Sequence, residues 1–217
     1  MKQIGGILLA VIVADCSGTT APTPVGSPPA VAVTVPITET ISGVVAESLR
    51  PIPGAQVDNG YGPGAWVITD ANGAFQLPTS KSVDSMRWVR AGKAGYAQPC
   101  AAPMNGNAPI NVQIVSRSAL TGAPLPSPDG LRTVSGVVVQ MTNSGVQQPV
   151  ANAWVDFEPS AIDDWPAAYT LSDARGRFSL CALPMDAVRI RANGGSGSYA
   201  LVTVAPGQDN IDVMLHY

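Results

Sequence analysis

A cluster of aromatic and acidic side chains is the part of this 217-residue sequence best suited to binding chemistry. Ala153 and Val155 are expected to face a hydrophobic core, so the residues that alternate with them on the same strand should face outward. Exposed aromatic rings stack on the apolar faces of sugars, and carboxylates accept hydrogen bonds from hydroxyl groups. The sequence therefore indicates a candidate carbohydrate-binding site formed by Trp154, Asp156, Asp163, Asp164, Trp165 and Tyr169.

A structural role for the same aromatic residues is the alternative. Trp165 would then cover an edge of a sheet, and Trp154 would pack beneath a loop or against another domain. Trp88 is a further outward candidate, because its neighbour Val89 is expected to face inward, and it too could belong to a contact between domains. Both interpretations stay open at the level of the sequence.

The residues needed for catalysis are scarce. His216, next to the end of the chain, is the only histidine, and a terminal strand is a poor support for a catalytic imidazole. The ligand set of a zinc peptidase cannot be assembled from one histidine and the three glutamates Glu39, Glu47 and Glu158. No phosphate-binding glycine loop is present, and residues 70–73 lack the further acidic ligands of a calcium loop. The sequence predicts a protein that is not an enzyme and has no cofactor or metal.

Two of the three cysteines could form a disulfide. Cys100 and Cys181 remain as a pair if Cys16 has a separate role at the amino terminus. An exported protein reaches a compartment that permits oxidation, so a bond between them is one interpretation. Two unpaired thiols near the ends of sheets are the other, because spacing alone does not show whether the residues come close enough to bond.

The amino terminus has the features of an export signal. Residues 1–15 combine a lysine at position 2 with a short apolar run, and Cys16 follows in the position of a lipid-modified cysteine. Asp15 departs from this pattern, because the residue before such a cysteine is normally small and neutral, so simple secretion is the alternative. Residues 16–36 are rich in Pro, Thr and Ser and predict a disordered tether. We expect a bacterial cell-envelope protein, lipid-anchored at the outer membrane or cell surface, or a secreted one.

Composition indicates an all-β body. The chain contains 22 glycines and 20 prolines, which disfavour helix interiors. Only 12% of its residues are charged, and its formal net charge is −3. Because this charge provides no basic surface for phosphate backbones, nucleic acid is not an expected partner, and contact with a membrane is expected only through a lipid anchor.

The body repeats one pattern of segments twice. Three matched pairs of segments keep their order: ISGVV at 41–45 with VSGVV at 134–138, PGAQV at 53–57 with VANAWV at 150–155, and TDANGAFQL at 69–77 with SDARGRFSL at 172–180. The third pair predicts a tight β-hairpin corner in each copy, formed by Asp70 with Gly73 and by Asp173 with Gly176. Phe75 and Phe178, just after the corners, are expected in the core. We predict sandwiches at 37–117 and 131–217, with a linker at 118–130.

These motifs resemble the carboxypeptidase regulatory-like domain. The resemblance rests on the three segment pairs and on VRAGKAGY at 89–96, and the second copy departs from it at 193–199. It implies two tandem seven-stranded sandwiches of the transthyretin-like and immunoglobulin-like type. The matched residues belong to turns and cores, so they specify fold better than function. The expected function is that of a non-catalytic structural or docking module with an envelope protein as partner; the alternative is a carbohydrate-binding module with a glycan as ligand.

Overall fold

The computed structural model describes residues 38–59, 66–80, 88–104, 108–158, 167–195 and 197–216. The signal-like segment, Cys16 and the tether lie outside these ranges. Pro36–Tyr217 forms one compact unit. We call residues 38–116 of this unit the first half and residues 132–215 the second half. In the described residues, no helix has the length and apolar character needed to cross a membrane.

The first half is built from short strands that are rich in Val, Ile and aromatic residues, as pleated structure favours. Its strands are β1 (Thr38–Glu47), β2 (Arg50–Pro51), β3 (Gln56–Asp58), β4 (Trp66–Ile68), β5 (Ala74–Ser80), β6 (Arg90–Gly92), β7 (Tyr96–Ala97), β8 (Ile110–Gln113) and β9 (Val115–Ser116). One sheet has the order β2-β1-β5, with β8 parallel to β1, and a second has the order β4-β3-β6. A single 3-10 turn (Arg117–Ala119) follows β9 among the described residues.

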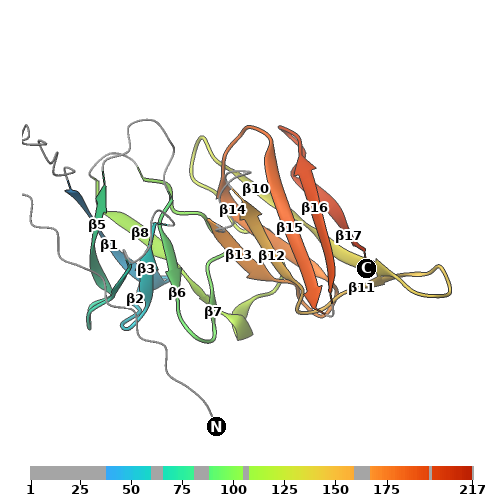
Figure 1. Cartoon of the computed structure of the whole chain (residues 1–217), viewed down its shortest axis with the longest axis horizontal. Coiled ribbons are helices and arrows are strands. Elements are labelled where there is room, and N and C mark those ends of the chain that lie inside the picture. The colour runs from blue at the N-terminus through green and yellow to red at the C-terminus, as the bar shows by residue number, and fades with distance from the viewer. Residues whose placement is uncertain are drawn as a thin grey trace, which may run out of the picture. The chain divides into compact units, whose positions relative to one another are not determined.

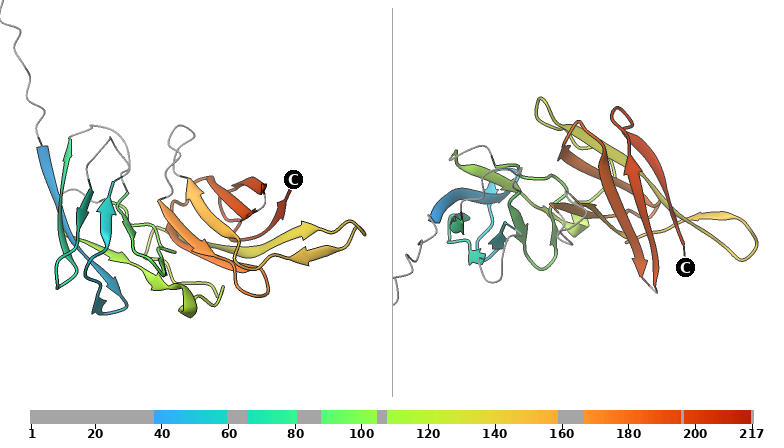
Figure 2. Two further views of the ribbon diagram at one scale, coloured as in Figure 1. Left: turned by 60° about the horizontal axis from the view of Figure 1, so that its bottom comes forward. Right: turned by 45° about the horizontal axis from the view of Figure 1, so that its top comes forward.

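The second half repeats this arrangement, with longer strands in its second sheet (Figure 1). They are β10 (Arg132–Met141), β11 (Gln147–Pro149), β12 (Trp154–Glu158), β13 (Ala168–Leu171), β14 (Arg177–Leu183), β15 (Val188–Gly195), β16 (Ser198–Val204) and β17 (Asn210–Leu215). One sheet has the order β11-β10-β14, with β17 parallel to β10, and the other has the order β13-β12-β15-β16. The hairpin of β10 and β11 extends away from the remaining strands (Figure 2).

The predicted all-β sandwich class is confirmed. Matched strands of the two halves pair in the same way: β1 with β5 and β8 corresponds to β10 with β14 and β17. Likewise, β3 between β4 and β6 corresponds to β12 between β13 and β15. In the described residues, β16 extends the second sheet of the second half by one strand, and the first half has no counterpart in that sheet.

Each half has its own buried hydrophobic cluster. Phe75 and Leu77 lie in the first cluster and Phe178 and Leu180 in the second, so the core positions expected for the two phenylalanines are confirmed. Alternation along the closing strands β8 and β17 also places their apolar residues inward. The second cluster contains Trp88, which comes from the chain of the first half. The two cores are therefore not built from separate stretches of sequence.

A glycine at the centre of each repeat allows the parallel strand to approach. A Cβ atom at Gly43 would collide with the carbonyl oxygen of Ile110, and one at Gly136 would collide with that of Ile211. The ring of Phe75 or Phe178 lies against the same position. The SGVV motif is thus explained by the close contact between the first strand of each half and its parallel neighbour.

The Asp-Gly corners form, but they do not close hairpins. Asp70 Oδ1 accepts hydrogen bonds from the N–H groups of Asn72 and Ala74 at 2.8 and 2.9 Å, and Gly73 has a φ of +70°. The strand before this corner, β4, pairs with β3, whereas the strand after it, β5, pairs with β1. The chain therefore passes from one sheet to the other, which corrects the predicted hairpin.

The corner of the second half is built in the same way. Asp173 Oδ1 accepts from the N–H groups of Arg175 and Arg177 at 2.8 and 2.9 Å, and Gly176 has a φ of +74°. It joins β13, which pairs with β12, to β14, which pairs with β10. Turn residues alone could not reveal this, because a corner between two sheets uses the same local conformation as a hairpin turn.

Candidate ligand-binding site

Trp154 and Tyr169 form an aromatic pair on the side of β12 and β13 that faces away from the second core. Their rings are stacked, with centroids 4.5 Å apart and planes inclined by 8°. Inward positions on β12 are taken by the buried residues Val155 and Phe157, as the alternation predicts. The ring of Trp154 is half-buried, and Tyr169 is largely buried. Asp156 joins this pair through a hydrogen bond to Trp154, so the structure brings together three of the six residues of the predicted site.

Asp156 was predicted to be exposed, and the structure shows that this is wrong. Its side chain is 0% exposed. Asp156 Oδ2 accepts hydrogen bonds from Trp154 Nε1 at 2.6 Å and from Arg191 Nη2 at 3.1 Å. The residue does face away from the core, but Arg191 lies directly across from it on β15 and reaches over it. Alternation on one strand could not indicate this cross-strand cover.

Burial raises the pKa of Asp156 above its ordinary value of 3.8, although hydrogen bonds from Arg191 and Trp154 act in the opposite direction. Its second oxygen, Oδ1, is buried and has no hydrogen-bond partner among the described residues. Burial also raises the pKa of Tyr169, against the influence of Arg117 and Arg90. A sugar hydroxyl would not reach Asp156 without displacing the groups that cover it, so this carboxylate supports Trp154 and does not bind ligand directly.

Two arginines on β15 complete an ionic network over the outer face of the sheet. Arg189 pairs with Glu158 at 2.9 Å, and Arg191 pairs with both Glu158 at 2.7 Å and Asp156 at 3.1 Å. Both arginines lie on the outer face, about one third exposed, and are held by the carboxylates of β12. The network fixes the strand from which Trp154 projects.

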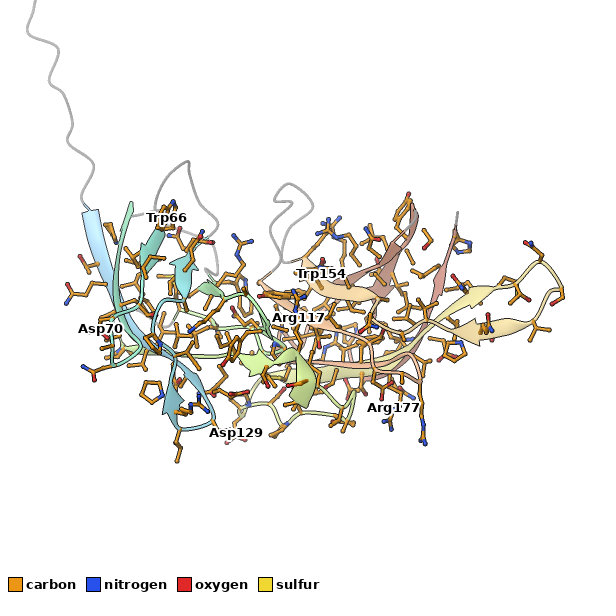
Figure 3. The ribbon with its side chains drawn as sticks, turned by 90° about the horizontal axis from the view of Figure 1, so that it is seen from below. Trp66, Asp70, Arg117, Asp129, Trp154 and Arg177 are labelled. Atoms are coloured by element: carbon orange, nitrogen blue, oxygen red, sulfur yellow. A yellow bond between two sulfur atoms is a disulfide. The ribbon has the colours of Figure 1, made fainter. Side chains whose placement is uncertain are left out.

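A cavity of about 310 Å³ lies beside the aromatic pair. Trp154 and Tyr169 form its wall on the side of the second half, and the opposite lining comes from β3, β6 and the turn after β6. The complete lining is Gln56, Asp58, Arg90, Gly92, Lys93, Ala94, Trp154 and Tyr169. Figure 3 labels Trp154 and shows the side chains around it. A concave site with aromatic walls and a few polar groups is the usual form of a small-molecule site.

The polar groups of the cavity are positioned by the strands below them. Arg90 and Asp58 lie directly opposite each other on β6 and β3, and Arg90 Nη2 donates to Asp58 Oδ2 at 2.8 Å. Gln56 is two residues before Asp58, so it lies on the same face of β3. Lys93 Nζ donates to the carbonyl oxygen of Pro53 at 2.6 Å. Two cations and one carboxylate therefore line this cavity.

Sequence reasoning did not identify these first-half residues as part of the site. Gln56 and Asp58 alternate with the buried Val57, and Arg90 alternates with the buried Val89 and Ala91. Outward positions on these short strands were thus recognisable from the sequence. What the sequence could not show is that this outer face meets Trp154, which lies far along the chain from both strands.

Other predicted residues fall outside this arrangement. Asp163, Asp164 and Trp165 lie outside the described residues. Trp88 was an outward candidate, but it is only 6% exposed and packs edge-to-face on Phe157, with ring centroids 5.5 Å apart. Its side chain lies in the second core. Trp88 therefore belongs to a contact between the two halves, which was the alternative interpretation of this residue.

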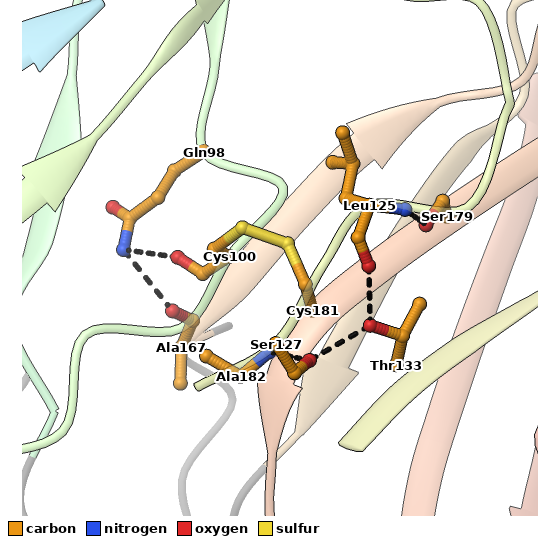
Figure 4. The surroundings of a disulfide bond; sticks show 9 residues. All are labelled: Gln98, Cys100, Leu125, Ser127, Thr133, Ala167, Ser179, Cys181 and Ala182. Atoms are coloured by element: carbon orange, nitrogen blue, oxygen red, sulfur yellow. Dashed lines mark hydrogen bonds between the residues drawn. A yellow bond between two sulfur atoms is a disulfide. The ribbon is translucent and has the colours of Figure 1, made fainter. Parts of the chain in front are cut away.

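The disulfide joins the two halves (Figure 4). Cys100 and Cys181 are bonded, with their Cα atoms 4.3 Å apart and 81 positions between them in the sequence. Backbone bonds flank the bridge: Ala101 N–H donates to the Cys181 carbonyl and Cys181 N–H donates to the Pro99 carbonyl, each at 2.9 Å. Of the two interpretations of this pair, the structure has the disulfide.

Gln98 strengthens the same junction. Its buried side chain accepts from the Ala91 N–H group at 2.7 Å and donates to the carbonyl oxygens of Val89 and Ala167 at 3.1 and 3.4 Å. The Gln98 carbonyl also accepts from the N–H group of Tyr169 at 2.8 Å. Because Tyr169 is one of the aromatic walls, this junction sets the position of the wall relative to the first half.

The segment predicted as a linker is also tied to the second half. The N–H group of Leu125 donates to Ser179 Oγ at 3.0 Å, and Ser127 Oγ accepts from the N–H group of Ala182 at 2.9 Å. Both contacts lie along β14, and Thr133 adds a bond to the Leu125 carbonyl at 2.6 Å. Residues 118–130 therefore run along the second half and add to the connection between the halves.

A second cavity is larger but has less binding chemistry. Its volume is about 640 Å³, and its lining consists mainly of Ala, Pro and other small or apolar residues, with Asp129 as its charged side chain. No group of three metal-ligating side chains is found in the part of the chain that the structure describes. The cavity beside Trp154 is therefore the better candidate site.

No protein-family model and no curated protein matches this chain. Solved structures with some similarity include the shaft pilin SpaA of Lactobacillus rhamnosus GG, which is 11% identical over 82% of this chain and 97% of the pilin, with a TM-score of 0.31. A streptococcal ancillary pilin is 12% identical over 82% of this chain and 62% of its own, with a TM-score of 0.28. GBS52, the minor pilin of Streptococcus agalactiae, is 10% identical over 82% of this chain and 96% of its own, with a TM-score of 0.25. Similarities this weak assign neither a family nor a function to the chain.

Proposed function

We propose that this chain is a non-catalytic module of the bacterial cell envelope, in which two joined β-sandwich halves form a spacer or docking piece. The observation that carries this proposal is the junction between the halves. It combines the Cys100–Cys181 disulfide with backbone hydrogen bonds and the insertion of Trp88 into the second core. A body held in this way keeps a fixed geometry between its two ends, as a spacer requires.

The amino-terminal sequence supports an envelope location. Its export-like signal, Cys16 and a following stretch rich in Pro, Thr and Ser fit a lipid-anchored protein whose body stands away from a membrane. The disulfide fits the same location, because such bonds persist in oxidising compartments. A protein partner would dock on the surface of the body, where β4, an edge strand among the described residues, can pair with an added strand.

Metabolic labelling with palmitate tests the anchor. The full chain should incorporate label and fractionate with membranes, and Cys16→Ala should abolish both. Cys100→Ala is the matched control, because a cysteine engaged in the disulfide is not a site of acylation, so it should keep the label. Labelling that persists in Cys16→Ala would show that Cys16 is not the acylated residue, and a full chain without label would leave simple secretion.

Small-angle X-ray scattering tests the spacer. The protein with its disulfide intact should give the same maximum particle dimension at every concentration that is too low for self-association. A broad distribution of dimensions for the oxidised protein would show that the halves move freely, and the spacer proposal would then fail.

Carbohydrate binding is a second candidate, favoured by the cavity beside Trp154 and Tyr169. Quenching or enhancement of tryptophan fluorescence by saccharides tests it, together with a glycan array. Trp154→Ala should abolish the response, whereas Tyr199→Ala should leave it unchanged, because Tyr199 is an exposed aromatic residue of β16 and does not line the cavity. A protein that responds to no saccharide on the array would remove this candidate.

A further inference from the structure

We propose that the cavity beside Trp154 is one end of an oligosaccharide-binding groove that crosses the outer face of the β4-β3-β6 sheet and ends at Trp66. This proposal rests on the carbohydrate-binding candidate above and adds the ligand class, the direction of the chain and a second aromatic platform. Trp66 was not a candidate at the level of the sequence. Trp66 is 54% exposed, and Figure 3 labels its side chain.

The strand register places Trp66 in one row with the polar lining of the cavity. Trp66 pairs with Asp58, and Asp58 pairs with Arg90, so the three residues lie side by side across β4, β3 and β6. Residues directly opposite each other in a sheet project from the same face. A second row contains Ile68, Gln56 and Gly92. Asp58, Arg90, Gln56 and Gly92 all line the cavity that Trp154 closes.

The dimensions of the sheet favour a ligand of several sugar units. Neighbouring strands are about 4.8 Å apart, so the backbones of Trp66 and Arg90 are separated by about 10 Å. Trp154 lies beyond Arg90, on the far side of the cavity. The two indole rings are therefore too far apart to stack on the same sugar ring. They can instead stack on the two end units of a short oligosaccharide.

The surface between Trp66 and Trp154 offers both hydrogen-bond donors and hydrogen-bond acceptors. Asp58 accepts hydrogen bonds, Arg90 donates them, and the amide of Gln56 does both. Sugar hydroxyls also donate and accept, so a row that offers both kinds of group is complementary to them. Asp58 and Arg90 are 15% and 19% exposed, and their ion pair holds both side chains in place at the floor of the groove.

Other ligand classes fit this surface less well. A nucleic acid strand needs several cations along its backbone, whereas the groove has Arg90 and Lys93 with Asp58 between them, in a chain of net charge −3. An acyl chain would leave the charges of Asp58 and Arg90 buried against hydrocarbon, which is costly. A peptide added to the free edge of β4 would pair with its backbone at the edge, not with side chains on the face. Aromatic ends with a polar centre match a saccharide.

The test is a chain-length series measured by isothermal titration calorimetry on the oxidised protein. The probes are cello-, chito-, xylo- and galacturono-oligosaccharides of two to six units. Trp66→Ala should weaken binding of the longest effective oligosaccharide by about tenfold, the effect of losing one aromatic stacking contact. The same change should leave the shortest bound member almost unaffected. Trp154→Ala should weaken binding at every chain length.

Two further variants make the result specific. Trp66→Phe keeps an aromatic face and should restore most of the affinity that Trp66→Ala loses. Tyr199→Ala removes an aromatic side chain of similar exposure, 62%, outside the groove and should change nothing. Because Trp66 is exposed on an edge strand, these variants are expected to fold, and thermal unfolding checks this.

The outcomes separate the groove from the candidate function on which it rests. If none of these oligosaccharides binds the unmodified protein, both the groove and carbohydrate binding at the cavity are overturned. If binding is lost in Trp154→Ala but is unchanged in Trp66→Ala at every chain length, carbohydrate binding stands and the groove is wrong. A loss that grows with chain length in Trp66→Ala, with rescue by Trp66→Phe, supports the groove.

Discussion

At the scale of single residues, two aspartates show how different environments give opposite responses to pH. Asp173 sits in a corner turn, where burial acts to raise its pKa, but the hydrogen bonds from Arg177 and from backbone N–H groups together outweigh burial and hold the pKa below 3.8. Asp156 is buried under Arg191, and burial outweighs the hydrogen bonds and raises its pKa above 3.8. The ionised form is therefore favoured by folding at Asp173 and disfavoured at Asp156.

We predict that Asp173→Ala lowers the free energy of unfolding by about 1 kcal/mol at pH 7, the usual effect of removing a side chain that binds backbone N–H groups. A carboxyl group with a lowered pKa stabilises the fold above its unfolded pKa and loses this effect as the pH falls through its folded pKa. The difference between the two proteins should therefore shrink below pH 3.8.

Urea unfolding at pH 7 and at pH values below 4 measures this difference. Asp70→Ala is the matched comparison, since Asp70 binds two N–H groups in the same way in the first half. A difference for Asp173→Ala that stays constant down to pH 2 would show that the charge of this carboxylate is not what stabilises the corner.

Asp156→Asn should have the opposite pH dependence. A carboxyl group with a raised pKa contributes stability that is fully present below its unfolded pKa of 3.8 and is lost as the pH rises through the folded pKa. The free energy of unfolding of the unmodified protein, relative to that of Asp156→Asn, should therefore fall as the pH rises from about 3.8. Paired urea titrations between pH 3 and pH 8 measure it. A relative stability that rises with pH would mean that Arg191 and Trp154 outweigh burial.

At the scale of elements, the repeated strand pairs depend on backbones that approach closely. Gly136→Ala would force a Cβ atom against the carbonyl oxygen of Ile211 and towards the ring of Phe178. We predict a loss of about 3 kcal/mol in the free energy of unfolding, at the upper end for overpacked cores. Gly92→Ala is the control, because no described atom lies within 4 Å of the place that its added Cβ would occupy, and it should be nearly neutral. Chemical denaturation compares the two, and equal effects would refute the close-approach argument.

The sequence was sufficient to predict inward positions and turns, but it did not show which strands pair with one another. Alternation identified Val155 as an inward residue, the position just after the second corner identified Phe178 as a core residue, and local turn chemistry identified both corners. It could not distinguish a hairpin from a passage between sheets, because both use the same local conformation.

Long-range contacts limited the prediction of the site in the same way. Asp156 is an outward residue on β12, but its burial depends on Arg191 of another strand. The cavity depends on a meeting of β3 and β6 with β12 and β13, which no periodicity within a strand encodes. Exposed positions could be identified from the sequence, but their assembly into one site required the tertiary structure.

At the scale of the whole molecule, the disulfide should provide a large part of the stability. A bridge that closes a loop of 81 residues restricts the unfolded chain by about 4.5 kcal/mol in the chain-entropy model. We predict that replacing both Cys100 and Cys181 with serine lowers the free energy of unfolding by about 2 to 5 kcal/mol. Guanidinium unfolding measures the effect. Reduction of the unmodified protein should reproduce it, and no change in either experiment would show that the junction is held by other contacts alone.

The remaining contacts of the junction should make the two halves unfold together. Trp88 belongs to the chain of the first half but lies in the second core against Phe157, so neither half can unfold without disturbing the other. We predict one calorimetric transition for the oxidised protein, with equal calorimetric and van't Hoff enthalpies. Trp88→Ala should cost about 3 to 5 kcal/mol, the range for truncating a large buried aromatic residue. Combined with the serine replacements at Cys100 and Cys181, it should split the transition into two. A single transition in this combined variant would mean that the backbone bonds between Gln98, Cys181 and their neighbours are enough to couple the halves.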